Sequence, residues 1–427
     1  MVNFLVEFLS TPTIVMGIVA LIGLVAMRNS PSTVITGTLK TILGFLVLSA
    51  GSNVICGALA NFNTMFNAAF GISGVVPEDN SLVAAVQTVL GFETPMIMLF
   101  SFVINVILAR ITPFKYIFLT GHMMFSFAGT MAIVLDQLGI RGWTAVAIGS
   151  VIQGVCMVIF PAIAQPFVRK VLETDEVAFG FWGSSLVCLC GWFGKLAGKK
   201  DRDKEKDTWE SVNVPEGIGF LKDMSVLMSI VMVAVFLVTA LLAGGKTMAQ
   251  VSGGTNVVLF AIIQGLTFVA GVLVLLQGVR MFLGEIVPAF KGISEKLVPG
   301  ARPALDIPIF YAAGPVATTI GFLFAMVGGL IATFISTQMT VCVLPGVIGL
   351  FFMGGAAGVI GDKLGGKRGA VVAGLTLGFL FTMIVALAYP LVDVTRYGVE
   401  GLWFASTDAI IVSVLMKLVG MVLGIAV

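Results

Sequence analysis

Long apolar runs separated by short polar interruptions make up most of this sequence, and their lengths predict membrane-spanning helices. A helix crosses the roughly 30 Å hydrocarbon core of a bilayer with about 20 apolar residues. The predicted class is therefore an all-α polytopic membrane protein. Runs near this length predict eleven spans, at 11–27, 34–60, 84–109, 116–136, 143–168, 221–243, 256–283, 309–336, 340–360, 369–392 and 404–426.

The first of these runs has an alternative interpretation, because residues 13–27 also resemble the apolar part of a signal peptide. No small-residue cleavage site follows it, and the next apolar run begins at once. We therefore expect this segment to remain in the protein as its first span.

Two stretches, 61–82 and 284–306, interrupt the helical pattern. Both are too apolar for ordinary surface loops and too rich in Gly and Pro for continuous helices. Non-helical backbone survives at membrane depth only where protein or a water-filled cavity covers it, so we predict two re-entrant or broken hairpins that line a cavity. Residues 171–197 form a third irregular stretch, with the character of a re-entrant or interfacial element.

The two interruptions belong to an internal duplication. Leu-Val-Leu-Ser-Ala-Gly at 46–51 matches Leu-Val-Leu-Leu-Gln-Gly at 273–278. Asp-x-Leu-Gly occurs at 136–139 and again at 362–365, so the two pairs of motifs have nearly the same spacing. This near-constant spacing predicts two repeat units, at 1–197 and 221–427, with the last helix in the second.

Five spans in each repeat make the two units face opposite ways across the membrane. The charges agree, since the Asp-x-Leu-Gly turn of the first unit is followed by Arg141 alone, whereas that of the second carries three basic residues. Inverted repeats with broken elements at matching positions indicate a transporter whose site lies near the middle of the membrane.

The linker at 198–220 sets the predicted orientation. Lys195–Asp207 contains six basic and four acidic residues. The positive-inside rule makes such a segment cytoplasmic. Counting spans outward from it places the N-terminus outside the cell and the C-terminus inside.

Composition excludes several classes of protein. Hydrophobic residues make up 58% of the chain and charged residues 11%, so lipid is its main solvent. We find no basic patch for nucleic acid, no Gly-rich phosphate loop, and no metal-ligand spacing. The five cysteines lie in apolar surroundings, where we expect inert buried thiols. No cofactor or metal is expected.

Ionisable residues inside apolar runs are the candidates for chemistry, because burying one in a membrane costs about 3 kcal/mol. His122, the one histidine in the chain, can donate and accept hydrogen bonds at once, which suits a polyhydroxylated ligand. Its alternative is a hydrogen-bonded packing residue. Glu93 lies deep in a predicted span and needs a partner or a cavity.

The two interruptions each end on a carboxylate. Asp306 follows the second, and Asp79 follows the first, beside Glu78 and Asn80. Carboxylates accept hydrogen bonds from sugar hydroxyls, and Asp306 could act as a base when a hydroxyl is phosphorylated. For Glu78 and Asp79, an exposed turn after Pro77 is the competing interpretation. Gln87, Gln153 and Gln264 are weaker candidates of the same kind. Arg280 and Glu285 are expected to form a structural salt bridge rather than to contact the ligand.

Several sequence motifs resemble the ascorbate-type IIC membrane component of the bacterial phosphotransferase system, in the ascorbate–galactitol superfamily. The likeness runs nearly from end to end. The motifs are Arg-Ile-Thr-Pro-Phe-Lys-Tyr-Ile-Phe-Leu-Thr at 110–120, Thr-Gly-His-Met-Met-Phe at 120–125, Gln-Gly-Val-Arg-Met-Phe at 277–282, Gly-Ile-Ser-Glu-Lys-Leu-Val-Pro-Gly-Ala at 292–301 and Ala-Leu-Asp at 304–306.

This resemblance implies a homodimer in the bacterial cytoplasmic membrane. Each protomer would combine a substrate-holding core domain with a dimerisation domain of V-shaped helix pairs, and the core would move like an elevator. A separate IIB protein carrying a phosphocysteine would phosphorylate the sugar during transport. No self-contained catalytic site is expected in this chain.

The resemblance also assigns site residues. The family's site histidine falls on His122, its site aspartate on Asp306, and the pair before its third span near Asp79 and Asn80. Two departures concern specificity, because lost hydrogen-bonding side chains normally change it. Ser126 stands where ascorbate members have Gln, and residues 180–185 lack a second histidine. Ascorbate, a related sugar acid and a polyol therefore all stay open as substrates.

The sequence predicts a permease that binds a small polyhydroxylated substrate through His122, Asp306, Glu93, Asp79, Asn80 and Ser126. An ion-coupled secondary transporter of a sugar acid or polyol, with Asp306 and Asp79 binding Na⁺ or H⁺, is the main alternative. A non-transporting membrane receptor or scaffold is a third hypothesis, against which the ionisable groups inside spans argue.

Overall fold

The computed structural model describes residues 12–70, 74–199, 203, 206–212, 224–296, 298–399, 401–422 and 424. The described part of the chain is mostly helical, with 78% helix. Elements of the first half are α2 (Pro12–Ala26), α3 (Pro31–Phe70), β1 (Val76–Pro77), α4 (Asp79–Leu90), α5 (Glu93–Ile111), β2 (Tyr116–Phe118), α6 (Gly121–Gln137), α7 (Gly142–Leu172), β3 (Ala178–Phe179) and α8 (Ser184–Ala197). Then follow the short 3₁₀ helix η1 (Trp209–Ser211), α9 (Met224–Ala243), α10 (Gly245–Val251), α11 (Val257–Lys296), β4 (Arg302–Leu305), η3 (Ile307–Ala313), α12 (Pro315–Ser336), α13 (Val347–Ala388), η4 (Tyr389–Leu391), η5 (Thr395–Tyr397), β5 (Leu402–Trp403) and α14 (Thr407–Val422).

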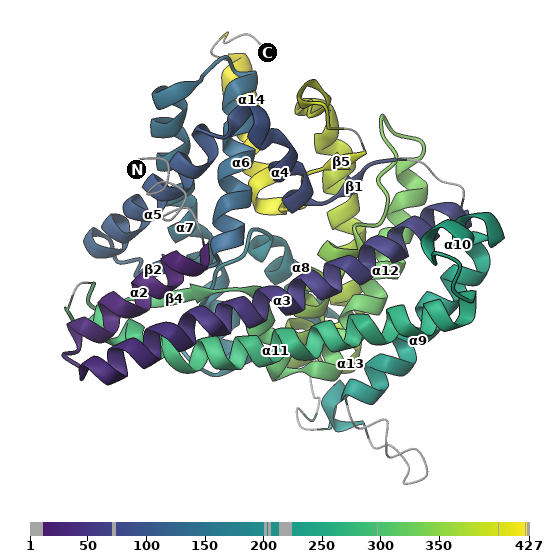
Figure 1. The fold of residues 1–427 in the computed structure, drawn as a ribbon, viewed down its shortest axis with the longest axis horizontal. Helices are drawn as coiled ribbons and strands as arrows, with labels where there is room; N and C mark the ends of the chain where they lie inside the picture. The colour runs from purple at the N-terminus through teal and green to yellow at the C-terminus, as the bar shows by residue number, and fades with distance from the viewer. Residues whose placement is uncertain are drawn as a thin grey trace.

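One layer of the molecule is built on the 40-residue helices α3 and α11, with α2, α9 and α10 beside them (Figure 1). The two long helices lie side by side and antiparallel: Lys40 pairs with Glu285 at 3.4 Å, and Asn61 hydrogen-bonds to Gln264 farther along. A helix rises 1.5 Å per residue, so each is about 60 Å long. That is about twice the hydrocarbon thickness of a bilayer, too long for one perpendicular crossing.

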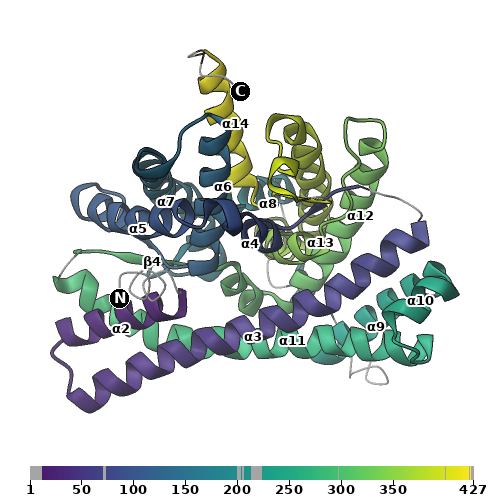
Figure 2. The ribbon, with the colours of Figure 1, turned by 45° about the horizontal axis from the view of Figure 1, so that its top comes forward.

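The remaining helices stand on this layer, as Figure 2 shows, with α5 and α7 at one end and α12 and α13 at the other. Helices α6, α8 and α14 lie between them. The largest fully buried side chains in the described structure belong mainly to this second layer, including Phe127, Trp182, Phe351 and Phe381. The core is therefore centred in the second layer.

Short parallel strands join the two halves of the chain. Strand β4, from the second half, lies between β2 and β3 of the first, with Ala304 opposite Phe118 on one side and Ala178 on the other. Conversely, β1 of the first half pairs with β5, and its neighbour Val75 forms a bridge to Val343. Each half therefore supplies one strand, β1 or β4, that pairs with segments of the other half.

Several helices and strands of the two halves recur in the same order. Helix α3 runs from 31 to 70 and α11 from 257 to 296, while β1 begins at 76 and β4 at 302, so one constant offset relates both pairs. Helices α5, α6 and α8 correspond in the same way to α12, the first part of α13, and α14. The duplication predicted from the motif spacing thus coincides with a correspondence of helices and strands.

The predicted interruptions are shorter in the structure than in the prediction. Helix α3 continues to Phe70 and α11 to Lys296, so 61–70 and 284–296 are helical and the prediction of broken backbone there is wrong. Pro288 removes one backbone donor and crowds the carbonyl of the preceding turn, and in membrane helices neighbouring structure can compensate for both effects. The extended backbone is confined to β1 and β4 and the residues beside them, while residues 71–73 and 297 lie outside the described part.

Other predicted spans have different boundaries. The segment predicted as 84–109 consists of α4 and α5 with a turn at Gly91 and Phe92. The predicted spans 340–360 and 369–392 correspond to the two helical segments of α13, which are separated by non-helical backbone at Gly366. Gly366 has a φ of 75°, which favours glycine. Six helices in the described residues are long and apolar enough to cross a membrane. The count of eleven spans stays a prediction.

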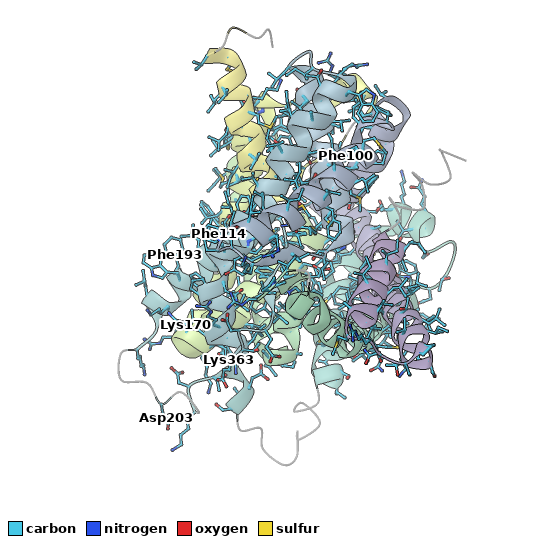
Figure 3. The ribbon with its side chains drawn as sticks, turned by 90° about the vertical axis from the view of Figure 1, so that its left-hand side faces the viewer. Phe100, Phe114, Lys170, Phe193, Asp203 and Lys363 are labelled. Carbon is cyan, nitrogen blue, oxygen red and sulfur yellow. The ribbon has the colours of Figure 1, made fainter. Side chains whose placement is uncertain are left out.

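Charged residues of α7, the linker and α13 lie together at one end of the molecule. Figure 3 shows Lys170, Asp203 and Lys363 together at this end, whereas Phe100 lies toward the opposite end. Asp203 and Lys170 belong to the first half or the linker, and Lys363 belongs to α13 of the second. These residues mark the end that the linker charges predict to be cytoplasmic, and the orientation stays a prediction.

Helices α12 and α13 pack closely because glycines face backbone atoms between them. A Cβ atom at Gly378 would overlap the carbonyl oxygen of Ala325, and one at Gly328 would overlap that of Leu375. By contrast, a Cβ atom at Gly57, inside α3, meets no atom within 4 Å. Small residues at such contacts let membrane helices approach closely.

We expect Gly378→Ala to lower the free energy of unfolding by about 1–3 kcal/mol, because the added methyl group overpacks the α12–α13 contact. The apparent melting temperature in detergent measures this loss. Gly57→Ala is the matched control and should leave the melting temperature unchanged or raise it, since alanine favours helix. Equal melting temperatures for Gly378→Ala and the unmodified chain would contradict the close packing.

Candidate functional site

The carboxyl ends of three parallel strands meet at the candidate site. His122 follows β2 by four residues, residues 180–185 follow β3, and Asp306 follows β4 directly. Because the strands are parallel and in register, the residues after all three strands emerge at the same edge. Ligands of parallel sheets commonly bind at this edge. Because β4 of the second half lies between β2 and β3 of the first half, Asp306 lies beside His122.

His122 and Asp306 face each other, with Nε2 of the imidazole 3.6 Å from Oδ2 of the carboxylate. This distance is too long for a hydrogen bond and fits an ion pair only when the imidazole is protonated. The His122 side chain is 37% exposed and that of Asp306 17% exposed. Both side chains are thus partly exposed, although the neighbours Gly121, Met123 and Leu305 are buried.

Asp306 is held by the start of the next helix. It is the N-cap of η3, where Oδ1 accepts a hydrogen bond from the Ile307 amide at 2.7 Å. Oδ2, the oxygen that faces His122, is therefore the one directed away from this cap. Tyr311 of the same 3₁₀ helix donates from its hydroxyl to the carbonyl oxygen of Phe352 at 2.9 Å, which ties η3 to α13.

His122 is fixed from both sides by residues 180–182. The Thr120 hydroxyl donates to the Gly180 carbonyl oxygen at 2.5 Å, and the Trp182 indole N–H donates to the Met123 carbonyl oxygen at 2.7 Å. The indole is fully buried and stacks on Phe118, with ring centroids 4.5 Å apart. Backbone hydrogen bonds and ring packing thus set where the first turn of α6 begins.

Two buried polar atoms near this turn have no hydrogen-bond partner among the described residues. The Ser126 hydroxyl lies one turn after His122, on the same side of α6, and Ser126 is 1% exposed. Gln153 of α7 donates to the Met124 carbonyl oxygen at 2.8 Å, but its Oε1 is unpaired. Buried polar groups are normally paired, so both atoms are available to a ligand or water.

Asp79, near the end of the first interruption, lies beside the other pair of strands, β1 and β5. Its carboxylate accepts hydrogen bonds from the Ala405 amide at 2.9 Å and the Ser406 hydroxyl at 2.5 Å. Asp79 therefore binds the junction of β5 and α14 rather than forming an exposed turn. Asn80 belongs to α4, but its side chain lies outside the described part of the structure.

Glu93 is buried, as its apolar surroundings predict, but the structure does not bring it to His122. Its Oε1 accepts a hydrogen bond from the Gly142 amide at 3.0 Å, in the turn after α6. His122 is at the opposite end of that 17-residue helix, about 20 Å away by helical rise. Of the weaker candidates, Gln264 binds Asn61 and Glu285 pairs with Lys40. The side chains of Gln87 and Arg280 lie outside the described residues.

Asp408 is a site neighbour that the sequence analysis missed. It is fully buried in the first turn of α14 and accepts hydrogen bonds from Ser184 and Ser185, just beyond the residues that hold His122. The signal was present, since Ser-Thr-Asp at 406–408 puts a carboxylate inside the predicted span 404–426. Its place at a helix start made it resemble an ordinary N-terminal residue.

Polar groups, rather than metal ligands, characterise this site. Among the described residues, no three His, Cys, Asp or Glu side chains are grouped so that they could hold a metal ion. One imidazole, one carboxylate and two unpaired buried polar atoms can donate to and accept from a ligand with several hydroxyl groups.

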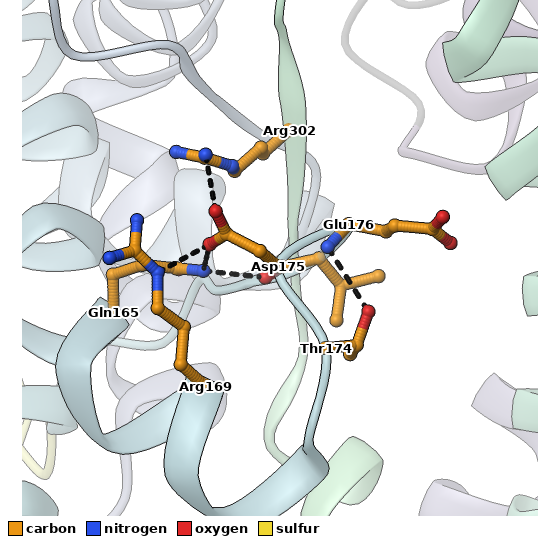
Figure 4. Close-up of polar contacts among 7 residues, drawn as sticks. Gln165, Arg169, Thr174, Asp175, Glu176 and Arg302 are labelled. Carbon is orange, nitrogen blue, oxygen red and sulfur yellow. Dashed lines mark hydrogen bonds and ion pairs between the residues drawn. The ribbon is translucent and has the colours of Figure 1, made fainter.

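A second polar cluster, centred on the Asp175 carboxylate, lies at the end of the three-stranded sheet where β3 and β4 begin (Figure 4). Asp175 accepts hydrogen bonds from Gln165 at 2.9 Å, Arg169 at 2.6 Å and Arg302 at 2.6 Å. Arg302 is the first residue of β4, so the cluster joins the approach to β3 with the strand that carries Asp306. Burial acts to raise the pKa of the Asp175 carboxyl, but hydrogen bonds from Arg169 and Gln165 and the nearby positive charges outweigh it and lower the pKa.

Comparison with known proteins gives two matches. A family model described as the PTS system sugar-specific permease component matches residues 7–408. The chain is also similar to the ascorbate-specific PTS system EIIC component of Mycoplasma pneumoniae, with 28% identity over 442 aligned residues. The alignment covers 90% of this chain and 66% of that relative, so the chain spans slightly less than two thirds of the relative's length.

The Asp175 cluster predicts a pH dependence of stability. A carboxyl whose pKa is lower in the folded protein stabilises the fold above its ordinary pKa, here 3.8, and this stabilisation is lost as the pH falls through the folded value. Asp175→Asn should therefore lower the melting temperature at pH 7, and the difference from the unmodified chain should shrink below about pH 3.8. Thermal unfolding from pH 7 to pH 3 measures both effects.

Glu176→Gln is the control for Asp175→Asn, because Glu176 is an exposed carboxylate next to the cluster. It should change the melting temperature little at any pH. A difference between Asp175→Asn and the unmodified chain that stays constant from pH 7 to pH 3 would refute the proposed stabilisation.

Proposed function

Because this chain belongs to the family of PTS system sugar-specific permease components, we propose that it is a IIC component that carries a small polyhydroxylated substrate across the membrane by group translocation. The observation that supports this role best is the His122–Asp306 pair, at the meeting point of strands from both halves. In this proposal the substrate is phosphorylated by a separate IIB protein.

His122, Asp306 and Ser126 are the proposed direct contacts. The imidazole can donate one hydrogen bond and accept another, the carboxylate accepts from hydroxyl groups, and the Ser126 hydroxyl is buried and has no partner among the described residues. During phosphoryl transfer the S–P bond of the phosphocysteine breaks, a bond forms from phosphorus to a substrate oxygen, and the hydroxyl proton must leave. Asp306 is the proposed base, since its Oδ2 is not engaged by the helix cap.

Ascorbate or a related sugar acid or polyol is the proposed substrate class. The named specificity of the Mycoplasma pneumoniae relative favours ascorbate. Ser126 and residues 180–185 differ from the ascorbate pattern, so the pocket has fewer large hydrogen-bonding side chains to offer. Asn80 is the proposed contact from the first interruption, because the offset that relates β1 to β4 places it opposite Asp306. Both oxygens of the neighbouring Asp79 are engaged by Ala405 and Ser406, so Asp79 is proposed to position this segment rather than to contact the substrate.

An inverted repeat is the proposed architecture, and the antiparallel contact of α3 with α11 supports it. These helices are counterparts in the two halves, and a two-fold axis relates counterparts that lie side by side and antiparallel. If the helices cross the membrane, this axis lies in the membrane plane, so the units at 1–197 and 221–427 face opposite ways. The linker at 198–220 joins them.

The two layers correspond to the proposed domains. The layer of α2, α3 and α9–α11 would form the V-motif dimerisation domain of a homodimer, and the layer that holds His122 and Asp306 would form the core (Figure 2). In an elevator mechanism the core moves against the first layer. The charged end with Lys170 and Lys363 is the proposed cytoplasmic face in a bacterial inner membrane (Figure 3). Helix α14 ends at the opposite end of the molecule, so the prediction that the C-terminus lies inside does not fit this orientation (Figure 1).

Uptake by proteoliposomes tests the coupling. We expect the purified chain to accumulate radiolabelled L-ascorbate, as ascorbate phosphate, only when phosphorylated IIB is inside the vesicles. Without phosphoryl transfer no step retains the substrate, so uptake should fall to the rate of empty vesicles. The control is a IIB protein whose phosphate-accepting cysteine is replaced. Accumulation of unmodified ascorbate driven by a Na⁺ or H⁺ gradient would instead establish an ion-coupled transporter.

A further inference from the structure

Asp408 is a buried carboxylate for which the proposed transport reaction has no direct use. Its side chain is fully buried in the first turn of α14, beside the equally buried hydroxyl of Thr407, which has no partner in the described part of the chain. Burying a carboxylate costs several kcal/mol unless hydrogen bonds compensate for lost hydration. Three donors do so here: the Ser184 hydroxyl at 3.1 Å, the Ser185 amide at 3.5 Å and the Ser185 hydroxyl.

All three donors belong to the start of α8, which directly continues the segment that holds His122. Gly180 accepts from Thr120, two residues before the histidine, and Trp182 donates to Met123, the residue after it. Ser184 and Ser185 follow Trp182 by two and three residues. The segment 180–185 is therefore fixed at one end by the first turn of α6 and at the other by Asp408.

The start of α14 is itself fixed by the first half of the chain. Asp79 accepts hydrogen bonds from Ala405 and Ser406, immediately before the turn that carries Asp408. Farther along, Gly420 of α14 packs against Leu138 at the end of α6. The position of Asp408 relative to α6 is thus set at both ends of α14.

We propose that Asp408 is a positioning residue for the substrate site, which orients His122 toward Asp306 through Ser184, Ser185 and the segment 180–185. The carboxylate contacts neither the proposed substrate nor the imidazole. Its three hydrogen bonds fix the segment, and the segment fixes the backbone on both sides of the histidine. Groups that hold a site residue at its working geometry commonly govern ligand affinity, because displacements of about 1 Å are costly.

The one histidine in the chain makes this proposal directly measurable. Protein labelled with ¹³C and ¹⁵N only in histidine, and purified without a histidine tag, gives one set of imidazole signals, from His122. We expect Asp408→Asn to shift these signals in the absence of any substrate, because loss of one acceptor oxygen releases a serine and lets the segment move. Trp182→Phe removes the indole donor and should shift the same signals.

Asp136→Asn is the matched control. Asp136 is also a buried carboxylate with strong partners, accepting from the Tyr397 hydroxyl at 2.6 Å and from Arg141, but it lies at the far end of α6. It should lower the melting temperature and leave the His122 signals in place. If Asp408 were only a stabilising residue, Asp408→Asn would behave as this control does, and the proposal would be overturned.

The functional consequence rests on the proposed function and is measured separately. We expect Asp408→Asn to weaken binding of L-ascorbate about tenfold or more, and Asp136→Asn to leave it unchanged. Should Asp408→Asn not fold, Ser185→Ala tests the same contact with a smaller change. Shifted His122 signals in a chain that never binds ascorbate would uphold the positioning role and refute the substrate. Unshifted signals in folded Asp408→Asn and Ser185→Ala proteins would refute the positioning role, whatever the chain transports.

Discussion

Backbone hydrogen bonds between the two halves of the chain are the constraint on which the site depends. Strand β4 is held on both sides by strands of the other half, and the residue that follows it is Asp306. Without this strand pairing, nothing would hold His122 of the first half beside Asp306 of the second. Unpaired backbone groups at membrane depth cost several kcal/mol each, so the strands must find partners, and this pairing supplies them. The same requirement places the polar side chains beside one another.

Carboxylates that accept several hydrogen bonds extend this constraint away from the strands. Asp79 joins the end of β1 to the start of α14, Asp408 joins α14 to α8, and Asp175 joins the end of α7 to β4. Each links segments that are far apart in the sequence. The site is therefore not a local feature of α6. Contacts with β2, β4, the segment 180–185 and α14 together determine where the imidazole lies. A buried charge with several donors fixes geometry more narrowly than apolar packing does.

Periodicity and spacing predicted much of this architecture, but contacts between segments were harder to predict. Helix α7 closely matches its predicted span, because a long apolar run leaves little choice of structure in a membrane. Glu93 was correctly placed in buried surroundings, yet its partner is Gly142, since burial follows from neighbouring residues and pairing does not. The paired strands have two to four residues, too few for any periodic pattern. Helix α11 passes through Pro288 where composition alone suggested a break.

A double-mutant cycle on His122 and Asp306 tests the central claim that the two side chains act on one ligand. Affinity for L-ascorbate would be measured by calorimetry for His122→Ala, Asp306→Asn, the double variant and the unmodified chain. Side chains that share a ligand are coupled, so the two losses in binding free energy should fail to add by about 1 kcal/mol or more. Losses that add to within about 0.5 kcal/mol would show independent residues and contradict the account.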